Sequence, residues 1–428
     1  MNKPRTPWYR MDNASFMYSS IQREEFSAIY RFSAVMAEDV DPALLQAAVD
    51  RTLPRFPGFA MKICRGFFWY YFEPNTAPGP FVREDVADPC RPVRFNEDNG
   101  WLIRFYYYRR RISLEVFHAL ADGAGALTFF RNLLAEYLRQ RGVDVPPGEG
   151  IADLDEPPPA SEREDAYLRY AGPASRALPR IPRAYQNRGT PEPFYTFHVT
   201  MGFLSVSALR EKARSYGASI TEYLAAVLLK LLVEKQRRER PIREKPVALA
   251  VPVNLRAFFP SETLRNFILT VQPSVDPALG DYDFPQLAAL VHNYMRLTAE
   301  PVKLRAGLTR GVRLLYNRFL ILIPRVVKNP IMLLSYGLTG VRPYSAVFTN
   351  PGPFRVPESM RPFIEHMEVV QGQATVARPH VSSISYGDTM EITFSGVQKE
   401  TDLEREFFRF LVREGLHVRI ESNRQGVQ

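Results

Sequence analysis

A histidine and an aspartate four positions apart carry the residue types and spacing best suited to catalysis. They lie in the segment His118-Ala119-Leu120-Ala121-Asp122-Gly123. An imidazole titrates near neutral pH, so His118 can take a proton from an attacking hydroxyl or amine without adjustment by its surroundings. Acyl transfer from a thioester needs such a base, together with a donor for the oxyanion that develops on the carbonyl. The segment is therefore compatible with acyl transfer in which His118 is the base.

The same residues also have a purely structural interpretation. His118 can be a core or turn histidine whose ring is satisfied by backbone groups, and Asp122 precedes an apolar stretch, as a helix cap does. Alternatively, a buried Asp122 pairs with an arginine and holds the turn that aims His118. Gly123 and Gly125 permit a close approach of backbone here and are equally natural in a loop. The residue types alone leave both interpretations open.

The flanking elements are expected to place this histidine at the end of a strand. Residues 111–117 alternate in the period of a half-buried strand, with Ile112, Leu114 and Val116 on one face. Residues 122–139 then repeat large apolar side chains at helical spacing. A strand, a sharp turn and a helix therefore bracket His118, so its ring can project into a crevice.

Strands and helices are expected to alternate in both halves of the sequence. The patterns predict further strands at residues 30–37, 66–73, 101–108, 194–203 and 247–253. Asp41-Pro42 caps a helix that Pro54 ends, and Ser219 to Glu222 fits a capping box for a helix over 221–236. Another helix is expected from Ser207, with Gly217 at its end. This succession favours an α/β fold with mixed sheets.

A proline-rich stretch over residues 145–193 separates the two halves. It contains Pro146-Pro147 and Pro157-Pro158-Pro159 and offers little regular structure. We therefore expect an N-terminal domain over residues 1–175, which carries the histidine motif, and a C-terminal domain over residues 176–428.

The composition and net charge of the sequence indicate which classes of binding partner to expect. The 428 residues are 46% hydrophobic and carry a formal net charge of +9, enough material for large cores and a basic surface. A basic surface suits nucleic acid, anionic membranes, acidic carrier proteins or phosphorylated small molecules. No nucleic-acid-binding motif accompanies the cluster Arg109-Arg110-Arg111, so we expect no nucleic-acid partner.

Cysteines and apolar stretches bear on the compartment. Cys64 and Cys90 are the only cysteines, too few for a zinc ribbon or a disulfide scaffold. Residues 1–10 lack the apolar core of a signal peptide, so the cytoplasm is the expected location. Residues 314–338 are apolar but are interrupted by charges and prolines, which argues against a membrane-spanning helix. This stretch can be buried in the protein, or can lie against a lipid, a membrane surface or an apolar substrate.

The motif His118-x-x-x-Asp122-Gly123 resembles the active-site motif of the superfamily of CoA-dependent acyltransferases and peptide-synthetase condensation domains, which includes chloramphenicol acetyltransferase. Its place, roughly a quarter of the way along the chain, also fits. The opening of that superfamily is similar to the stretch from Tyr30 to Pro57, through Val40-Asp41, Leu45, Leu53 and Arg55-Phe56-Pro57.

Two later segments extend the resemblance. Pro252-Val253-Asn254-Leu255-Arg256 is similar to the strand end whose arginine pairs with the motif aspartate, which implies that Arg256 binds Asp122 across the two halves. A surface arginine is the alternative. Phe348-Thr349-Asn350-Pro351-Gly352-Pro353 resembles a serine-asparagine-any-glycine segment that approaches the tunnel, with threonine in place of serine. Thr349 or Asn350 would position substrate or polarise the thioester, and a plain turn is the alternative.

The resemblance covers nearly the whole chain and is nearest to stand-alone bacterial proteins described as alcohol acetyltransferase-like, on the segment Ser261-Glu262-Thr263-Leu264-Arg265-Asn266-Phe267. The plant branch carries an aspartate-phenylalanine-glycine-tryptophan-glycine motif near its end, where this chain has only Tyr386-Gly387-Asp388. Within these 428 residues no segment resembles a carrier or adenylation module. We therefore expect use of a free thioester rather than a role in peptide assembly.

The resemblance implies two chloramphenicol-acetyltransferase-like domains arranged as a V, with a tunnel at their interface. Acyl-CoA would serve as co-substrate, and His118 would take the proton of a small or lipid-like acceptor while CoA leaves. No acyl-enzyme, bound cofactor or metal is implied, and the sequence has no Gly-x-Ser-x-Gly elbow. Two alternatives remain: a condensation-type enzyme that takes its acyl group from an acyl carrier protein, and an inactive relative that binds a lipid or a protein partner.

Overall fold

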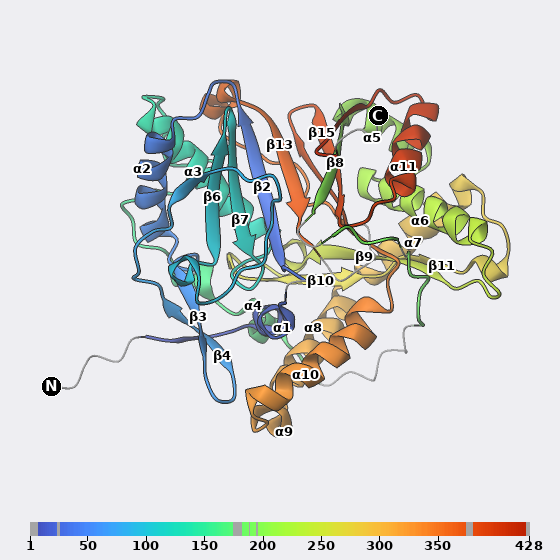
Figure 1. Cartoon of the computed structure of the whole chain (residues 1–428), viewed down its shortest axis with the longest axis horizontal. Helices are drawn as coiled ribbons and strands as arrows, with labels where there is room; N and C mark the ends of the chain where they lie inside the picture. The colour runs from blue at the N-terminus through green and yellow to red at the C-terminus, as the bar shows by residue number, and fades with distance from the viewer. Residues whose placement is uncertain are drawn as a thin grey trace.

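Two mixed β-sheets, each covered by helices, organise the computed structural model (Figure 1). The structure describes residues 7–23, 26–173, 182–187, 189–193, 196–373 and 380–424. The predicted domain boundary between residues 175 and 176 lies outside these ranges, so its position stays a prediction.

The first sheet comes mainly from the N-terminal half. Within the described ranges it has five strands, in the order β13 (Ile364–Gln371), β2 (Ile29–Met36), β7 (Arg111–Phe117), β6 (Ile103–Tyr108) and β5 (Val82–Glu84). β5 runs parallel to β6 and the other pairs are antiparallel. Helices α2 (Pro42–Thr52) and α3 (Gly123–Gln140) pack against each other beside this sheet (Figure 1).

The second sheet belongs to the C-terminal half. Its strands follow the order β10 (Ile268–Val271), β9 (Val247–Asn254), β12 (Ala346–Thr349), β14 (His380–Tyr386), β15 (Thr389–Gly396), β8 (His198–Ser205) and β16 (Arg419–Ser422), and β11 (Ser274–Val275) also pairs with β9. Its core is shared with the helices α5 (Val206–Ser215), α6 (Ile220–Arg238), α7 (Phe284–Thr298) and α11 (Asp402–Arg413).

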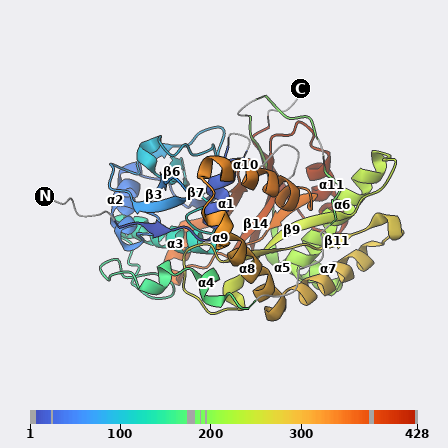
Figure 2. The ribbon, with the colours of Figure 1, turned by 90° about the horizontal axis from the view of Figure 1, so that it is seen from below.

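One strand joins the two halves. β13 comes late in the sequence, yet it pairs antiparallel with β2 over seven register positions from Ile364↔Met36 to Gln371↔Tyr30. A further group of helices lies beneath both sheets in Figure 1: α1 (Asn13–Ile21), α4 (Ala166–Tyr170), α8 (Pro301–Leu315), α9 (Arg318–Ile321) and α10 (Arg325–Tyr336). In the view from below, α10 lies beside α1, and the two helices are in contact (Figure 2).

Most of the predicted elements are present. The Asp41 side chain caps α2, the Ser219–Glu222 capping box opens α6, and Gly217 after α5 has the positive φ of +67° that favours glycine. Residues 194 and 195, at the start of one predicted strand, lie outside the described ranges.

One predicted strand is wrong in part. Residues 66–73 were expected to form a continuous strand, but the chain turns between β3 (Met61–Arg65) and β4 (Tyr70–Pro74). Gly66 N donates to Trp69 O at 2.8 Å, which closes the turn of this hairpin. The prediction failed because residues 67–69 are aromatic, a composition that is typical of strands, although here they form the hairpin tip.

The apolar stretch over residues 314–338 forms the end of α8, then α9 and α10, with Pro324 between the last two. In the described part of the chain, no single helix combines the length and apolarity needed to cross a bilayer. One pair, α5 and α6, passes that test jointly by length and composition, although the two helices are bent by 72°.

Candidate active site

The predicted motif forms a turn between β7 and α3. His118 follows the last residue of β7, and its backbone N–H donates to Ala28 O at 2.8 Å. Asp122 is the N-cap of α3, where its Oδ1 accepts from Gly125 N at 3.0 Å. The strand, turn and helix expected from the sequence are therefore present at these positions.

Two tyrosine rings fix the plane of the half-buried His118 imidazole. Tyr18 of α1 stacks on it, with 4.3 Å between ring centroids and 21° between planes, and Tyr30 of β2 meets it edge-on at 4.9 Å. Burial raises the pKa of Tyr30 well above its ordinary value, so its hydroxyl keeps its proton. That hydroxyl donates to Ala121 O at 2.9 Å and to Asp122 O at 3.1 Å, which also fixes the turn.

Asn266 determines which ring nitrogen of His118 carries the proton. Its Nδ2 donates to the backbone oxygen of His118 at 2.9 Å, and its Oδ1 lies 3.1 Å from His118 Nδ1. Since an amide oxygen only accepts hydrogen bonds, Nδ1 must be the donor in this contact. The neutral imidazole then has an unprotonated Nε2, the form that a general base requires.

The surroundings favour the neutral form of the ring. Burial lowers the pKa of His118 below its ordinary value of 6.5, and this effect outweighs the opposing influences of the backbone, Asp122 and Asn266. At neutral pH His118 is therefore available to accept a proton.

Arg256 is placed against Asp122, as the resemblance implied. Its Nη1 donates to Asp122 Oδ2 at 2.8 Å, and the same oxygen accepts from Phe267 N at 2.7 Å. The remaining donors of Arg256 bind the backbone oxygens of Thr263 and Arg265 at 2.7 to 2.9 Å. Asp122 and Arg256 together thus fasten the loop that carries Asn266 to the beginning of α3.

The glycines of the motif differ in their roles. A Cβ built on Gly125 would lie 2.0 Å from Leu264 O, so the close approach of the 255–267 loop requires glycine there. A Cβ on Gly123 would make only an ordinary contact, 3.6 Å from Phe32 Cζ. Gly123 instead lines the cavity beside His118.

The His118 ring reaches a cavity of about 480 Å³ between the two halves of the chain. Its wall contains residues of α1, β2 and the motif turn from one half, and of β9, β10 and β12 from the other. Its polar lining residues include His118, Asn254, Thr270, Thr349, Asn350, Gln371 and His380. The size and the mixed lining are typical of a small-molecule site.

Thr349 and Asn350 both line this cavity, at the end of β12. Asn350 also has a structural role, because its Nδ2 donates to Thr221 Oγ1 at 3.0 Å and its Oδ1 accepts from Gly352 N at 2.9 Å. The turn interpretation of Asn350 is thus supported, and a role of either residue in binding substrate stays a prediction.

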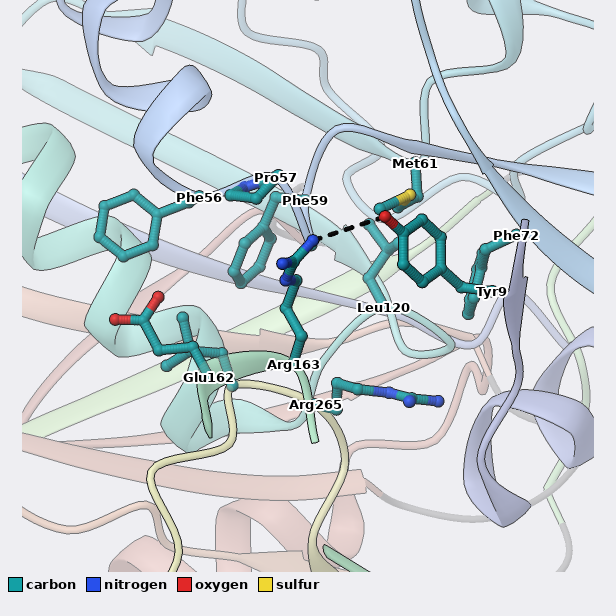
Figure 3. A pocket seen from close by; sticks show the side chains of 12 residues that line it. Tyr9, Phe56, Pro57, Phe59, Met61, Phe72, Leu120, Glu162, Arg163 and Arg265 are labelled. Atoms are coloured by element: carbon teal, nitrogen blue, oxygen red, sulfur yellow. Dashed lines mark hydrogen bonds between the residues drawn. The ribbon is translucent and has the colours of Figure 1, made fainter. Parts of the chain in front are cut away.

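A second cavity lies against Leu120 of the motif turn (Figure 3). Figure 3 shows Arg163 reaching across it toward Tyr9, whose hydroxyl accepts a hydrogen bond from Arg163 Nη1 at 3.5 Å. Its volume is about 50 Å³, against about 480 Å³ for the cavity at His118. The cavity at His118 is the candidate substrate site, because the imidazole itself lines it.

Metal binding can be assessed for the described residues only. Within those ranges, no group of three or more His, Cys, Asp or Glu side chains is arranged to hold a metal ion.

Sequence reasoning did not identify Asn266, Tyr18 or Tyr30 as parts of the site. Asn266 was noted only within a segment of resemblance, and its contact with His118 spans 148 positions. The two tyrosines carry no local pattern that distinguishes them from core aromatics. Only the arrangement in space reveals these three roles.

Comparisons with known proteins show the fold. No family model and no curated protein matches the sequence. Among solved structures, polyketide synthase associated protein 5 from Mycobacterium tuberculosis aligns over 96% of this chain and 98% of its own, with a TM-score of 0.64 and 18% identity. The trichothecene 15-O-acetyltransferase of Fusarium sporotrichioides aligns over 95% and 94%, with a TM-score of 0.62 and 9% identity.

A third similar structure is the starter condensation domain of rhizomide synthetase, a mutant solved in complex with C8-CoA and Leu-SNAC. It aligns over 95% of this chain and 94% of its own, with a TM-score of 0.59 and 14% identity. The chain thus has the two-domain α/β fold of condensation domains and chloramphenicol-acetyltransferase-like proteins over nearly its whole length. The expected fold class is confirmed.

Proposed function

We propose that this chain is an acyltransferase of the alcohol O-acetyltransferase type. It moves an acyl group from acyl-CoA to the hydroxyl or amine of a small or lipid-like acceptor, with His118 as general base. The observation that carries the proposal is the pair of contacts between Asn266 and His118, which assign the proton to Nδ1, on a ring that lines a cavity of about 480 Å³. The shared fold with an acetyltransferase and with a domain solved with C8-CoA supports it.

The reaction needs one proton carrier. As the acceptor oxygen attacks the thioester carbonyl, its O–H bond breaks and the proton passes to His118 Nε2. The tetrahedral intermediate then collapses, its C–S bond breaks, and the leaving thiolate takes the proton back from the imidazolium. The products are the ester and CoA, and His118 returns to its neutral form without an acyl-enzyme.

Three residues around His118 hold its imidazole in the orientation and tautomer that a general base requires. Asn266 holds the productive tautomer of His118, whereas Asp122 and Arg256 hold the loop that presents Asn266. Positioning of this kind matters because an error of about 1 Å in the placement of a reacting group can cost about 100-fold in rate. Thr349 and Asn350, in the wall of the same cavity, are proposed to contact the donor or the acceptor.

The test is a thiol-release screen of acyl-CoA chain lengths against alcohols and amines, with the product identified by mass. Thiol release that depends on the acceptor, together with an ester or amide product, would support acyl transfer. Ligand binding without any thiol release would instead support an inactive relative that binds a lipid or a protein.

A second candidate is a condensation-type enzyme that takes its acyl group from an acyl carrier protein. The fold likeness to condensation domains, including one from a synthetase, favours this candidate. Turnover on the same acyl group presented by CoA and by a carrier protein distinguishes the two. Our first proposal predicts the higher kcat/KM on the CoA thioester.

A further inference from the structure

Helix α10 carries its two cationic residues on the side that faces the protein and exposed apolar residues on its outer side. Its Lys328 is only 3% exposed, and the ammonium donates to Phe68 O at 3.0 Å and lies 3.4 Å from the centre of the Trp69 ring. Arg325 also faces the β3–β4 hairpin, since its Nε donates to Gly66 O at 3.2 Å. Both cationic residues of α10 thus face the protein, beside Met332, Leu333 and Tyr336, which pack against the core of the first sheet. A helix on a water-exposed surface normally turns its charged residues outward instead.

The outward side of α10 is apolar. Val327, Ile331 and Leu334 follow one another at helical spacing and are all exposed, Leu334 by 67%. Val326 is 75% exposed on the same helix.

This apolar side continues onto the neighbouring elements. Leu322, just before α10, is exposed, and so is Phe67 at the hairpin tip, whose backbone oxygen accepts from Arg325 N at 2.9 Å. We call the exposed apolar side chains of this region the α10 face: Phe67, Leu322, Val326, Val327, Ile331 and Leu334. Figure 1 places α9, α10 and the β3–β4 hairpin together at one end of the molecule, beyond both sheets.

The segment around the α10 face is strongly basic. Residues 301–342 contain eight Lys and Arg residues and no Asp or Glu, so they carry a charge of +8, against +9 for the whole chain. The basic residues are Lys303, Arg305, Arg310, Arg313, Arg318, Arg325, Lys328 and Arg342. Arg325 and Lys328 face the protein and Lys303 pairs with Glu300 at 3.3 Å. The positive charge that this segment presents to solvent therefore comes from the exposed residues Arg305, Arg310, Arg313 and Arg342.

We propose that the α10 face docks onto an anionic lipid bilayer. Exposed aliphatic and aromatic side chains insert at the boundary between headgroups and acyl chains, and neighbouring Lys and Arg residues are attracted to anionic headgroups. A second copy of the chain fits less well, because a two-fold interface would bring two such basic segments together. The apolar side chains also argue against an acidic protein alone as the partner, since charge pairing would not use them.

An aromatic-lined cavity adjoins the α10 face. It has a volume of about 580 Å³, and its wall includes Phe68, Trp69, Leu315 and Ile321. α1 contributes Phe16 to this cavity and Met17 and Tyr18 to the cavity at His118. Docking would therefore bring a bilayer to the side of the protein that carries this aromatic-lined cavity. The proposal does not depend on the reaction catalysed.

The test is flotation of the full chain with vesicles of phosphatidylcholine alone and of phosphatidylcholine mixed with phosphatidylglycerol. The wild type is expected to float with the mixed vesicles and to dissociate as the salt concentration rises. The double variant V327E/L334E places two carboxylates on the α10 face and is expected to lower partitioning by about tenfold or more. The matched control L279E/V412E makes the same change at two exposed apolar residues on other elements and should float like the wild type.

Three outcomes would overturn the proposal. The first is wild-type protein that does not float with the mixed vesicles, or floats equally with neutral ones. The second is equal partitioning of V327E/L334E and the control. The third is a wild-type dimer in solution that V327E/L334E dissociates, which would assign the face to a second copy. Thiol release from a short, water-soluble acyl-CoA separates this test from the proposed function, because V327E/L334E should retain wild-type turnover there.

Discussion

Asn266 and His118 are joined by two hydrogen bonds that fix each other's orientation. The amide nitrogen of Asn266 donates to the backbone oxygen of His118, and its amide oxygen faces His118 Nδ1 at 3.1 Å. The backbone contact excludes the flipped amide, which would bring two oxygens together. The tautomer of the imidazole is therefore set by a residue 148 positions away in the sequence.

Replacing Asn266 should affect the base more than substrate binding. Asn266→Ala should lower kcat by about 10–100-fold with a smaller change in KM, because the ring loses the partner that holds its tautomer and orientation. Asn266→Asp places a carboxylate beside Nδ1, which raises the pKa of the imidazole. The acid limb of its pH–rate profile should therefore move to higher pH. An unshifted limb in Asn266→Asp would leave Asn266 with a packing role only.

Removing Arg256 should cost stability as well as activity. Arg256→Ala leaves the buried Asp122 carboxylate without its cationic partner, which we expect to lower the free energy of unfolding by about 3 kcal/mol. Arg237→Ala is the matched control: this exposed arginine pairs with Glu244 and Asp281, and its loss should cost less than about 1 kcal/mol. Urea unfolding of both variants checks the difference. Equal losses would show that the Arg256–Asp122 pair adds nothing beyond a surface ion pair.

The two motif glycines should differ in their tolerance of a methyl group. Gly125→Ala forces Leu264 O away and should destabilise the protein by about 1–3 kcal/mol, with loss of activity as the 255–267 loop shifts. Gly123→Ala meets only Phe32 at 3.6 Å, so its melting temperature should stay close to that of the wild type. Thermal unfolding of the pair is the measurement, and the reverse order of stability would contradict the geometry described here.

The pH dependence follows from the buried imidazole. Because the pKa of His118 is lowered from 6.5, kcat/KM should fall on the acid side with a midpoint below 6.5 and be level above it. The unfolded chain binds this proton more readily than the folded one. The contribution of His118 to stability is therefore complete above pH 6.5 and declines as the pH falls through 6.5 toward the folded pKa. An acid limb centred above 6.5 would contradict a base whose pKa is lowered by burial.

Local patterns predicted the elements around the site well. The alternation in residues 111–117, the cap at Asp122 and the glycines after it act over a few positions, so the strand, turn and helix could be placed before the structure was known. The hairpin tip at residues 66–69 was missed for the same reason. Aromatic residues are common in strands, so a prediction from local composition assigns these residues to a strand. The turn becomes evident only from the antiparallel pairing of β3 with β4.

Long-range features could not be derived in this way. The pairing of β13 with β2 and the contact of Asn266 with His118 join residues far apart in sequence, and no short pattern encodes them. Arg256 was placed correctly against Asp122 only through the family resemblance. The exposed apolar side of α10 could not be predicted either, because the sequence shows the apolar residues of this helix without showing which of them face the protein.

The central claim is that His118 Nε2 takes the acceptor's proton, and the most direct test is the kcat/KM of His118→Ala in the thiol-release assay. The wild type must first turn over an acyl-CoA with an acceptor. The variant should then lose about 10²–10⁴-fold in kcat/KM, because a positioned general base contributes that much, while its melting temperature stays near that of the wild type. A folded His118→Ala protein with turnover equal to the wild type would contradict the role assigned to His118.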